Sequence, residues 1–125
     1  MEMMISASDR YFKALSELDI DAYLSCFSPD AELFDPYGGR PFKGNEGLVK
    51  WFEGMERTWS KFTMNSVANF VSGDREAVQW QATGSAHSGR EAHFSGINVF
   101  TMDDTGLITR LEGYWDFKSM LAQIS

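Results

Sequence analysis

Asp35 is the acidic residue of this sequence whose neighbours best suit proton transfer. It stands between Phe34 and the pair Pro36-Tyr37, where a short predicted strand ends. Apolar neighbours disfavour the ionised carboxylate, so desolvation raises its pKa toward the range that a general acid or base needs. The carboxyl could equally form an Asx turn that stabilises the Asp-Pro-Tyr-Gly loop. Spacing alone leaves both interpretations open.

Asn98 and Tyr11 carry two further polar groups that could act on a ligand. Asn98 interrupts an apolar stretch, and its amide costs free energy there unless its donors and acceptor find partners. Strand alternation puts Asn98 on one face with Phe94, Gly96 and Phe100. That face could contact a ligand, or it could be a solvated outer face. Tyr11 lies at helical spacing, where a tyrosine is more often a core residue than a catalyst.

The last predicted strand ends with an aromatic and an acidic candidate, Trp115 and Asp116. Alternation places Trp115 on the face of Leu111 and Gly113, and Asp116 on the opposite face unless a bulge intervenes. Asp116 could therefore be a charge at the rim or a cap for the segment that follows. His87 and His93 have no further ligands nearby, so we expect surface histidines and no metal site.

Length, composition and net charge limit the kinds of partner that this protein can bind. The chain has 125 residues, too few for a second core, so we expect one domain over residues 1–125. Hydrophobic residues make up 43% and aromatic residues 14%, which is enough for a packed interior. Eleven basic against 18 acidic residues give a net charge of -7, which argues against nucleic acid and anionic membranes as partners. The acidic balance favours an uncharged ligand.

The single cysteine and the amino terminus bear on the compartment. Cys26 excludes an internal disulfide and, beside Tyr23 and Phe27, is expected to be a small core residue. Residues 1–6 lack the basic region and apolar run of a signal peptide, and no stretch is long and apolar enough to span a membrane. We therefore expect a cytoplasmic protein.

These candidates need helices and strands to position them. Helical spacing predicts a first helix capped by Ser6 or Ser8 and a second capped by Asp19 or Asp21. The second extends to Phe27, where a Ser-Pro-Asp turn ends it. The first 30 residues therefore form a helical hairpin.

The rest of the chain predicts one strand, one helix and then a sheet. A short strand over residues 31–35 leads to a loop, and Gly44-Asn45 opens the third and longest helix. Beyond residue 61 the period changes to two, and short turns separate four strands over residues 63–72, 76–87, 90–102 and 107–117. Residues 118–125 form a helical turn or a frayed tail.

This order of elements predicts an α+β domain with a cone-shaped curved antiparallel sheet and three helices packed on its concave face. A pocket between the helices and that face is the expected place for a ligand.

The residues resemble the ketosteroid isomerase and SnoaL-like branch of the nuclear transport factor 2 superfamily. The resemblance covers nearly the whole chain and is strongest over the stretches 10–15, 18–21, 26–31 and 34–38. It implies that Tyr11 occupies the oxyanion-hole position and Asp35 the general-base position. In ketosteroid isomerase the second donor is a protonated aspartate. This chain has Asn98 there, an amide that donates without a pKa shift but is less acidic.

The resemblance implies a cofactor-independent isomerase or cyclase that removes a proton next to a carbonyl in a small apolar molecule. The catalytic candidates are Tyr11, Asp35 and Asn98. Candidate substrate contacts are Phe52, Phe100, Trp115 and Asp116. SnoaL-like proteins often have a similar Tyr-Trp-Asp ending, which makes Asp116 a second acid or base candidate. The alternative is a non-catalytic ligand-binding or dimerisation domain, and either protein would be a homodimer.

Overall fold

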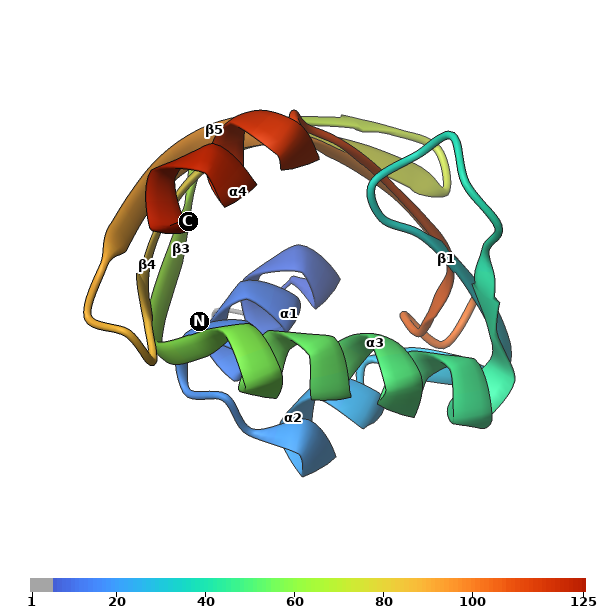
Figure 1. Ribbon diagram of the computed structural model, residues 1–125. Helices are drawn as coiled ribbons and strands as arrows, with labels where there is room; N and C mark the ends of the chain where they lie inside the picture. The colour runs from blue at the N-terminus through green and yellow to red at the C-terminus, as the bar shows by residue number, and fades with distance from the viewer. Residues whose placement is uncertain (1–5) are drawn as a thin grey trace.

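A computed structural model describes residues 6–125 (Figure 1). Its elements in chain order are α1 (Ala7–Ser16), α2 (Ile20–Leu24), β1 (Phe27–Phe34), β2 (Phe42–Lys43), α3 (Gly44–Thr58), β3 (Trp59–Ser72), β4 (Arg75–Ala86), β5 (Glu91–Met102), β6 (Ile108–Tyr114) and α4 (Phe117–Ile124). The α+β class predicted from the sequence is confirmed. The expectation about a signal peptide concerns residues that, but for Ser6, lie outside the described part. No helix within residues 6–125 has the length and apolar character needed to cross a bilayer.

The six strands form one curved sheet in the order β2-β1-β6-β5-β4-β3. Strands β3 to β6 are an antiparallel meander, as their short turns predict. The sheet is nevertheless not antiparallel throughout, because β1 pairs in parallel with β6. These two strands are joined through most of the chain and not by a hairpin, so no local turn imposes opposite directions on them.

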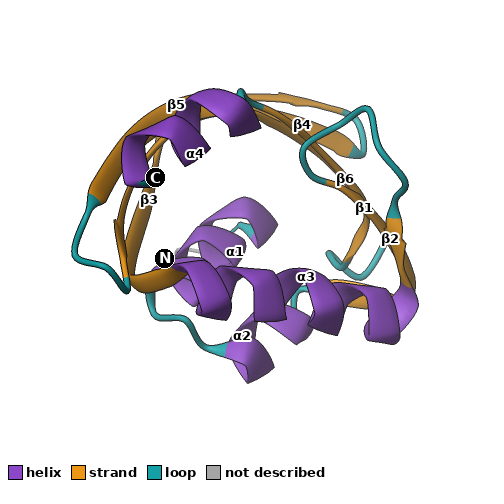
Figure 2. Cartoon of the chain, in the orientation of Figure 1, coloured by secondary structure: helices purple, strands orange, loops and turns teal. Residues whose placement is uncertain are grey.

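The sheet curves around α1, and α3 crosses its open side (Figures 1 and 2). Helix α1 packs against β3, α3 packs against β1 and β2, and α4 lies on β5. The expected three helices are therefore joined by a fourth, because the segment predicted as a helical turn or a frayed tail is an eight-residue helix. Its start is fixed by Asp116, whose carboxylate accepts a hydrogen bond from the Ser119 N–H at 3.0 Å.

The first strand begins earlier than predicted. Helix α2 ends at Leu24, and β1 starts at Phe27, so the predicted Ser-Pro-Asp turn lies inside the strand. Its pairing with β6 jumps from Phe27 opposite Ile108 to Glu32 opposite Arg110, which is a bulge over the proline. A proline has no N–H for the ladder and is tolerated at such a bulge, so here it bends a strand where a turn was expected.

The interior on the side of α1 and α2 is built from aromatic rings. Tyr11 is completely buried, with ring centroids 5.6 Å from Phe100 and 5.9 Å from Phe27. Tyr23 is also completely buried, and its hydroxyl donates a hydrogen bond of 2.9 Å to the Leu48 carbonyl of α3. The predicted core position of Cys26 is confirmed by its complete burial. These contacts hold the helices against the sheet.

Candidate functional site

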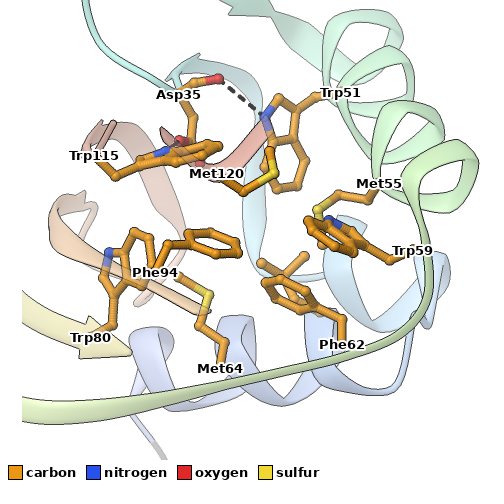
Figure 3. A pocket seen from close by; sticks show the side chains of 11 residues that line it. Asp35, Trp51, Met55, Trp59, Phe62, Met64, Trp80, Phe94, Trp115 and Met120 are labelled. Carbon is orange, nitrogen blue, oxygen red and sulfur yellow. Dashed lines mark hydrogen bonds between the residues drawn. The ribbon is translucent and has the colours of Figure 1, made fainter. Parts of the chain in front are cut away.

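Asp35 follows β1 directly and is held in place on two sides (Figure 3). Its carboxylate accepts a hydrogen bond from the indole N–H of Trp115, and its main-chain carbonyl accepts one of 3.3 Å from the indole N–H of Trp51. The following loop is tied to β6, because the Tyr37 N–H donates to the Gly113 carbonyl at 2.7 Å. The orientation of the carboxylate is therefore set by tertiary contacts and not by an Asx turn.

The environment of Asp35 makes it a stronger base than an ordinary aspartate. Burial raises the pKa of the Asp35 carboxyl to about 6, and the hydrogen bond from Trp115 opposes part of that rise. A carboxylate with a pKa near 6 is still ionised at neutral pH and accepts a proton more readily than one near 4. The desolvation effect expected from the sequence is thus present at this residue.

Gly113 allows Asp35 and Asn98 to lie close together. A Cβ atom on Gly113 would lie 2.6 Å from Oδ1 of Asp35 and 3.1 Å from Oδ1 of Asn98. Gly113 also stands directly opposite Asn98 in the pairing of β5 and β6. The two polar side chains therefore meet over the space that a side chain at position 113 would fill.

Asn98 is buried, and only part of its amide is used. Its Oδ1 accepts a hydrogen bond of 2.9 Å from the indole N–H of Trp80. That bond fixes the amide orientation and leaves Nδ2 as a buried donor without a partner among residues 6–125. An unsatisfied buried donor costs about 1–3 kcal/mol, so its presence at this position calls for an explanation.

Tyr11 carries a second buried donor of the same kind as the Asn98 Nδ2. Its buried hydroxyl has no hydrogen-bond partner in the described part of the chain. Burial, and to a smaller extent the charge of Asp35, raises the pKa of Tyr11 well above its ordinary value. The phenol therefore stays protonated and can donate a hydrogen bond.

Two hollows that share lining residues lie beside Asp35. The inner recess has a volume of about 40 Å³, and its walls are Leu15, Asp35, Trp51, Met55, Trp59, Phe62, Met64, Trp80, Phe94, Trp115 and Met120 (Figure 3). This is about the space of a water molecule or two. The outer cavity has a volume of about 920 Å³, which suits a small organic ligand.

The outer cavity shares part of its wall with the recess: Asp35, Trp51, Met55, Trp59, Trp115 and Met120. It adds residues 36–40 of the loop after β1, the exposed side of α3, and Phe42 and Phe117. Asp35 therefore stands where the two hollows meet. Within residues 6–125, no group of His, Cys, Asp and Glu side chains is placed to hold a metal ion.

The seven predicted site residues divide between the hollows, the core and the surface. Asp35 and Trp115 line both hollows. Tyr11, Asn98, Phe52 and Phe100 are completely buried and line neither. The ring of Phe52 packs 4.9 Å from that of Tyr23, which is a core contact.

Asp116 lies outside both hollows, contrary to the position expected for a substrate contact. Strand β6 ends at Tyr114, and no bulge turns Asp116 inward. Its carboxylate caps α4 instead. This is one of the two roles that its position in the sequence left open.

Several lining residues were not singled out from the sequence. Trp51 lies beside the core stripe of α3, Trp59 is the first residue of β3, and Trp80 comes from the inward face of β4. Helical and strand periodicity alone would have placed these tryptophans inside. What it does not say is which of them border a hollow and which fill the core.

Solved structures with the same fold include proteins with known ligands or activities. The ketosteroid isomerase from Mycobacterium sp. is 22% identical over 91% of this chain and 93% of that chain, with a TM-score of 0.80. A putative polyketide cyclase from Xanthomonas campestris pv. campestris is 20% identical over 95% and 94%, with a TM-score of 0.83. RV0760c from Mycobacterium tuberculosis, in complex with estradiol-17β-hemisuccinate, is 21% identical over 90% and 93%, with a TM-score of 0.80.

At these identities the structures show the fold alone, and they confirm the predicted likeness to the nuclear transport factor 2 fold. No curated protein sequence matches the chain. The profile of one family does match it, the SnoaL-like domain, over residues 8–111. Because this match spans most of the sequence, the chain belongs to the SnoaL-like domain family.

Proposed function

We propose that this protein is a cofactor-independent isomerase or cyclase that removes a proton next to a carbonyl group in a small, largely apolar molecule. The observation that carries the proposal is Asp35, a carboxylate whose pKa burial raises to about 6 and which lines both the inner recess and the outer cavity. A base of that strength beside a ligand-sized cavity is suited to abstracting a weakly acidic C–H proton.

The reaction begins when the carboxylate of Asp35 takes the proton. The C–H electron pair moves into the enolate, and its oxygen carries the negative charge. Two neutral donors, the Tyr11 hydroxyl and the Asn98 Nδ2, then stabilise that oxygen by hydrogen bonds. Both donors are supported in this role by their lack of any other partner among residues 6–125.

Two outcomes follow from the enolate. In an isomerase, protonated Asp35 returns the proton to a different carbon of the same molecule. In a cyclase, the enolate carbon attacks a second carbonyl of the ligand, and the proton goes to the resulting alkoxide. Each outcome restores the Asp35 carboxylate, so neither consumes a cofactor.

The mechanism requires the inner recess to widen when a ligand enters. Tyr11 and Asn98 do not border the recess at its volume of about 40 Å³. The carbonyl end of a ligand must therefore displace some of the aromatic side chains that fill the recess before it reaches both donors.

Deuterium exchange tests the role of Asp35. The protein is incubated in D₂O with a panel of β,γ-unsaturated cyclic ketones and aryl methyl ketones, and loss of the α-proton signals is followed by NMR. Asp35→Asn should slow the exchange of any ketone that the protein accepts by about a hundredfold or more, because it removes the base. Asp116→Asn is the matched control, since its side chain caps α4 away from both hollows. Unchanged exchange in Asp35→Asn would contradict the proposal.

A second candidate function is favoured by the burial of Tyr11 and Asn98 away from both hollows: binding of a small molecule without catalysis. In that case ketone or phenol ligands bind, but no exchange occurs, and affinity is insensitive to Asp35→Asn and Tyr11→Phe. Calorimetry on the same variants separates this function from the first.

We also propose that the protein forms a homodimer through the outer face of the sheet. Ile97 is 46% exposed and stands opposite Tyr114, which is 43% exposed, in the pairing of β5 and β6. The ring of Tyr37 packs 5.4 Å from that of Tyr114 and extends this apolar patch. Light scattering should give a dimer mass at micromolar concentration and a monomer for Ile97→Lys. A monomeric wild type would contradict the proposal.

A further inference from the structure

The rim of the outer cavity carries a charge opposite to that of the chain. The chain has 11 basic and 18 acidic residues. The basic residues on the cavity wall are Arg40, Lys50 and Arg57, whereas the acidic ones are Asp35, at the inner end, and Glu53. The side chains at the mouth therefore carry a net positive charge, although the chain as a whole carries a net negative charge.

The three cations come from two sides of the cavity. Arg40 belongs to the loop after β1, whereas Lys50 and Arg57 lie seven residues apart on α3 and so share one face of that helix. The guanidinium of Arg57 lies along the cavity wall, because a Cβ on Gly54, itself a lining residue, would be 3.8 Å from Nη2 of Arg57. A ligand in the outer cavity thus has cations available from both the loop and the helix.

These cations are not engaged elsewhere in the described part of the chain. Lys43 and Arg110, by contrast, lie outside the cavity and form ion pairs with Glu32. Within residues 6–125, Arg40, Lys50 and Arg57 form no ion pair and no side-chain hydrogen bond, and even Glu53 is not within ion-pair distance of them. Their charge is available to a ligand.

The remaining wall is suited to an apolar body. Trp51, Trp59 and Trp115 line this cavity together with Met55 and Met120. Planar guanidinium groups bind carboxylates well because their N–H groups match the two oxygens. The cavity thus combines an apolar centre, a base at its inner end and cations at its mouth.

We propose that the outer cavity binds small carboxylic acids, with an apolar ring system between the tryptophans and the carboxylate at the rim beside Arg40, Lys50 and Arg57. The orientation, with the carbonyl end toward Asp35, rests on the proposed function. The preference for an acid does not, because it is a property of binding alone. This inference replaces the uncharged ligand expected from net charge by one that carries a single anion.

The test uses one ring system with and without the charge: 6-acetyl-2-naphthoic acid and its methyl ester. Binding is measured by isothermal titration calorimetry at low ionic strength. The acid should bind about tenfold more tightly than the ester, and added salt should reduce the difference because it screens charges near the surface. Equal affinities of the acid and the ester would overturn the proposal.

Substitutions at the rim test whether its cations cause the difference in affinity between the acid and the ester. Arg40→Gln and Arg57→Gln should each weaken binding of the acid about three- to tenfold and leave binding of the ester unchanged. Arg75→Gln is the matched control, because Arg75 is exposed at the start of β4 and lines neither hollow. An equal loss in Arg75→Gln would show that net charge and not the rim is responsible, and would overturn the proposal.

The acetyl group of the same probe separates this inference from the proposed function. Tight, rim-dependent binding of the acid without deuterium exchange at the acetyl methyl group supports the acid site and contradicts the proposed catalysis. Exchange that is equally fast for the acid and the ester, with equal affinities, supports the catalysis and contradicts the acid site.

Discussion

Two buried tyrosines in one aromatic cluster differ in whether their hydroxyl groups have hydrogen-bond partners. Tyr11 and Tyr23 are both completely buried, and their ring centroids lie 6.1 Å apart. The hydroxyl of Tyr23 donates to the Leu48 carbonyl and joins α2 to α3, whereas the hydroxyl of Tyr11 has no partner among the described residues. Around Tyr23 the polar groups are satisfied, and around Tyr11, Asn98 and Asp35 they are left unpaired or desolvated.

This difference supports the proposal that the region of Tyr23 is structural and that the region of Tyr11, Asn98 and Asp35 receives the ligand. A buried donor without an acceptor lowers stability, whereas the same donor gains a partner when a ligand oxygen arrives. Burial and aromatic packing are alike in the two regions, so neither could have distinguished them. Hydrogen-bond satisfaction does.

The largest difference in the rate of ketone exchange is expected between two variants that each remove one tyrosine hydroxyl. Tyr11→Phe should slow ketone exchange about a hundred- to a thousandfold, the usual loss for one oxyanion donor, and should not lower the melting temperature. Tyr23→Phe should do the opposite: exchange close to wild type and a loss of about 1 kcal/mol of stability. Exchange kinetics and thermal melts on both variants check this, and the comparison fails if the two behave alike.

Filling the space over Gly113 should have the next largest effect. In Gly113→Ala the new Cβ would lie 2.6 Å from Oδ1 of Asp35, closer than such contacts allow, so the carboxylate must move. We expect exchange to fall by about a hundredfold, since small displacements of a catalytic group are costly. Gly106→Ala changes a glycine in an open turn as a control for stability, although its positive φ adds strain. Full activity in Gly113→Ala would show that the placement of Asp35 is not critical.

Replacing Trp80 should slow exchange less, because its side chain acts only by orienting the Asn98 amide. Trp80→Phe removes the N–H that fixes the Asn98 amide, so exchange should fall about tenfold with more change in kcat than in KM. The loss should not add to that of Asn98→Ala, since both variants remove one oriented donor. Additive losses in the double variant would mean that Trp80 acts independently of Asn98.

The smallest expected effect is the pH dependence of stability that the Asp35 carboxyl causes. A carboxyl whose pKa is higher in the folded state stabilises the protein when protonated, and this stabilisation is lost as pH rises through about 6. Asp35→Asn does not titrate, so its stability relative to wild type should increase by about 1 kcal/mol between pH 5 and 7.5. Urea unfolding at the two pH values measures this. Wild-type exchange should rise over the same range as the base ionises, and a flat profile would assign the base elsewhere.

Local patterns were sufficient for the elements that are stabilised locally. Caps and helical spacing predict α1 and α2, and alternation with short turns predicts β3 to β6. The same alternation groups Asn98 with Phe94, Gly96 and Phe100 but leaves open whether that face is solvated, and the complete burial of Asn98 decides that it is not. Where prediction fails, at the Pro29 bulge and in α4, the outcome depends on contacts with β6 and β5 that lie far away in the sequence.

The sequence by itself determined the α+β class and the acidic residue with the most apolar neighbours, because these follow from residue types and short-range spacing. Its likeness to known sequences, and not its periodicity, gave the family. Only the tertiary structure decided that the Trp115 indole holds the Asp35 carboxylate, that Gly113 lets it meet Asn98, and that Asp116 caps a helix outside the hollows. It also decided which cations surround the outer cavity. These features join residues up to 80 positions apart, and no local periodicity specifies how such segments approach one another.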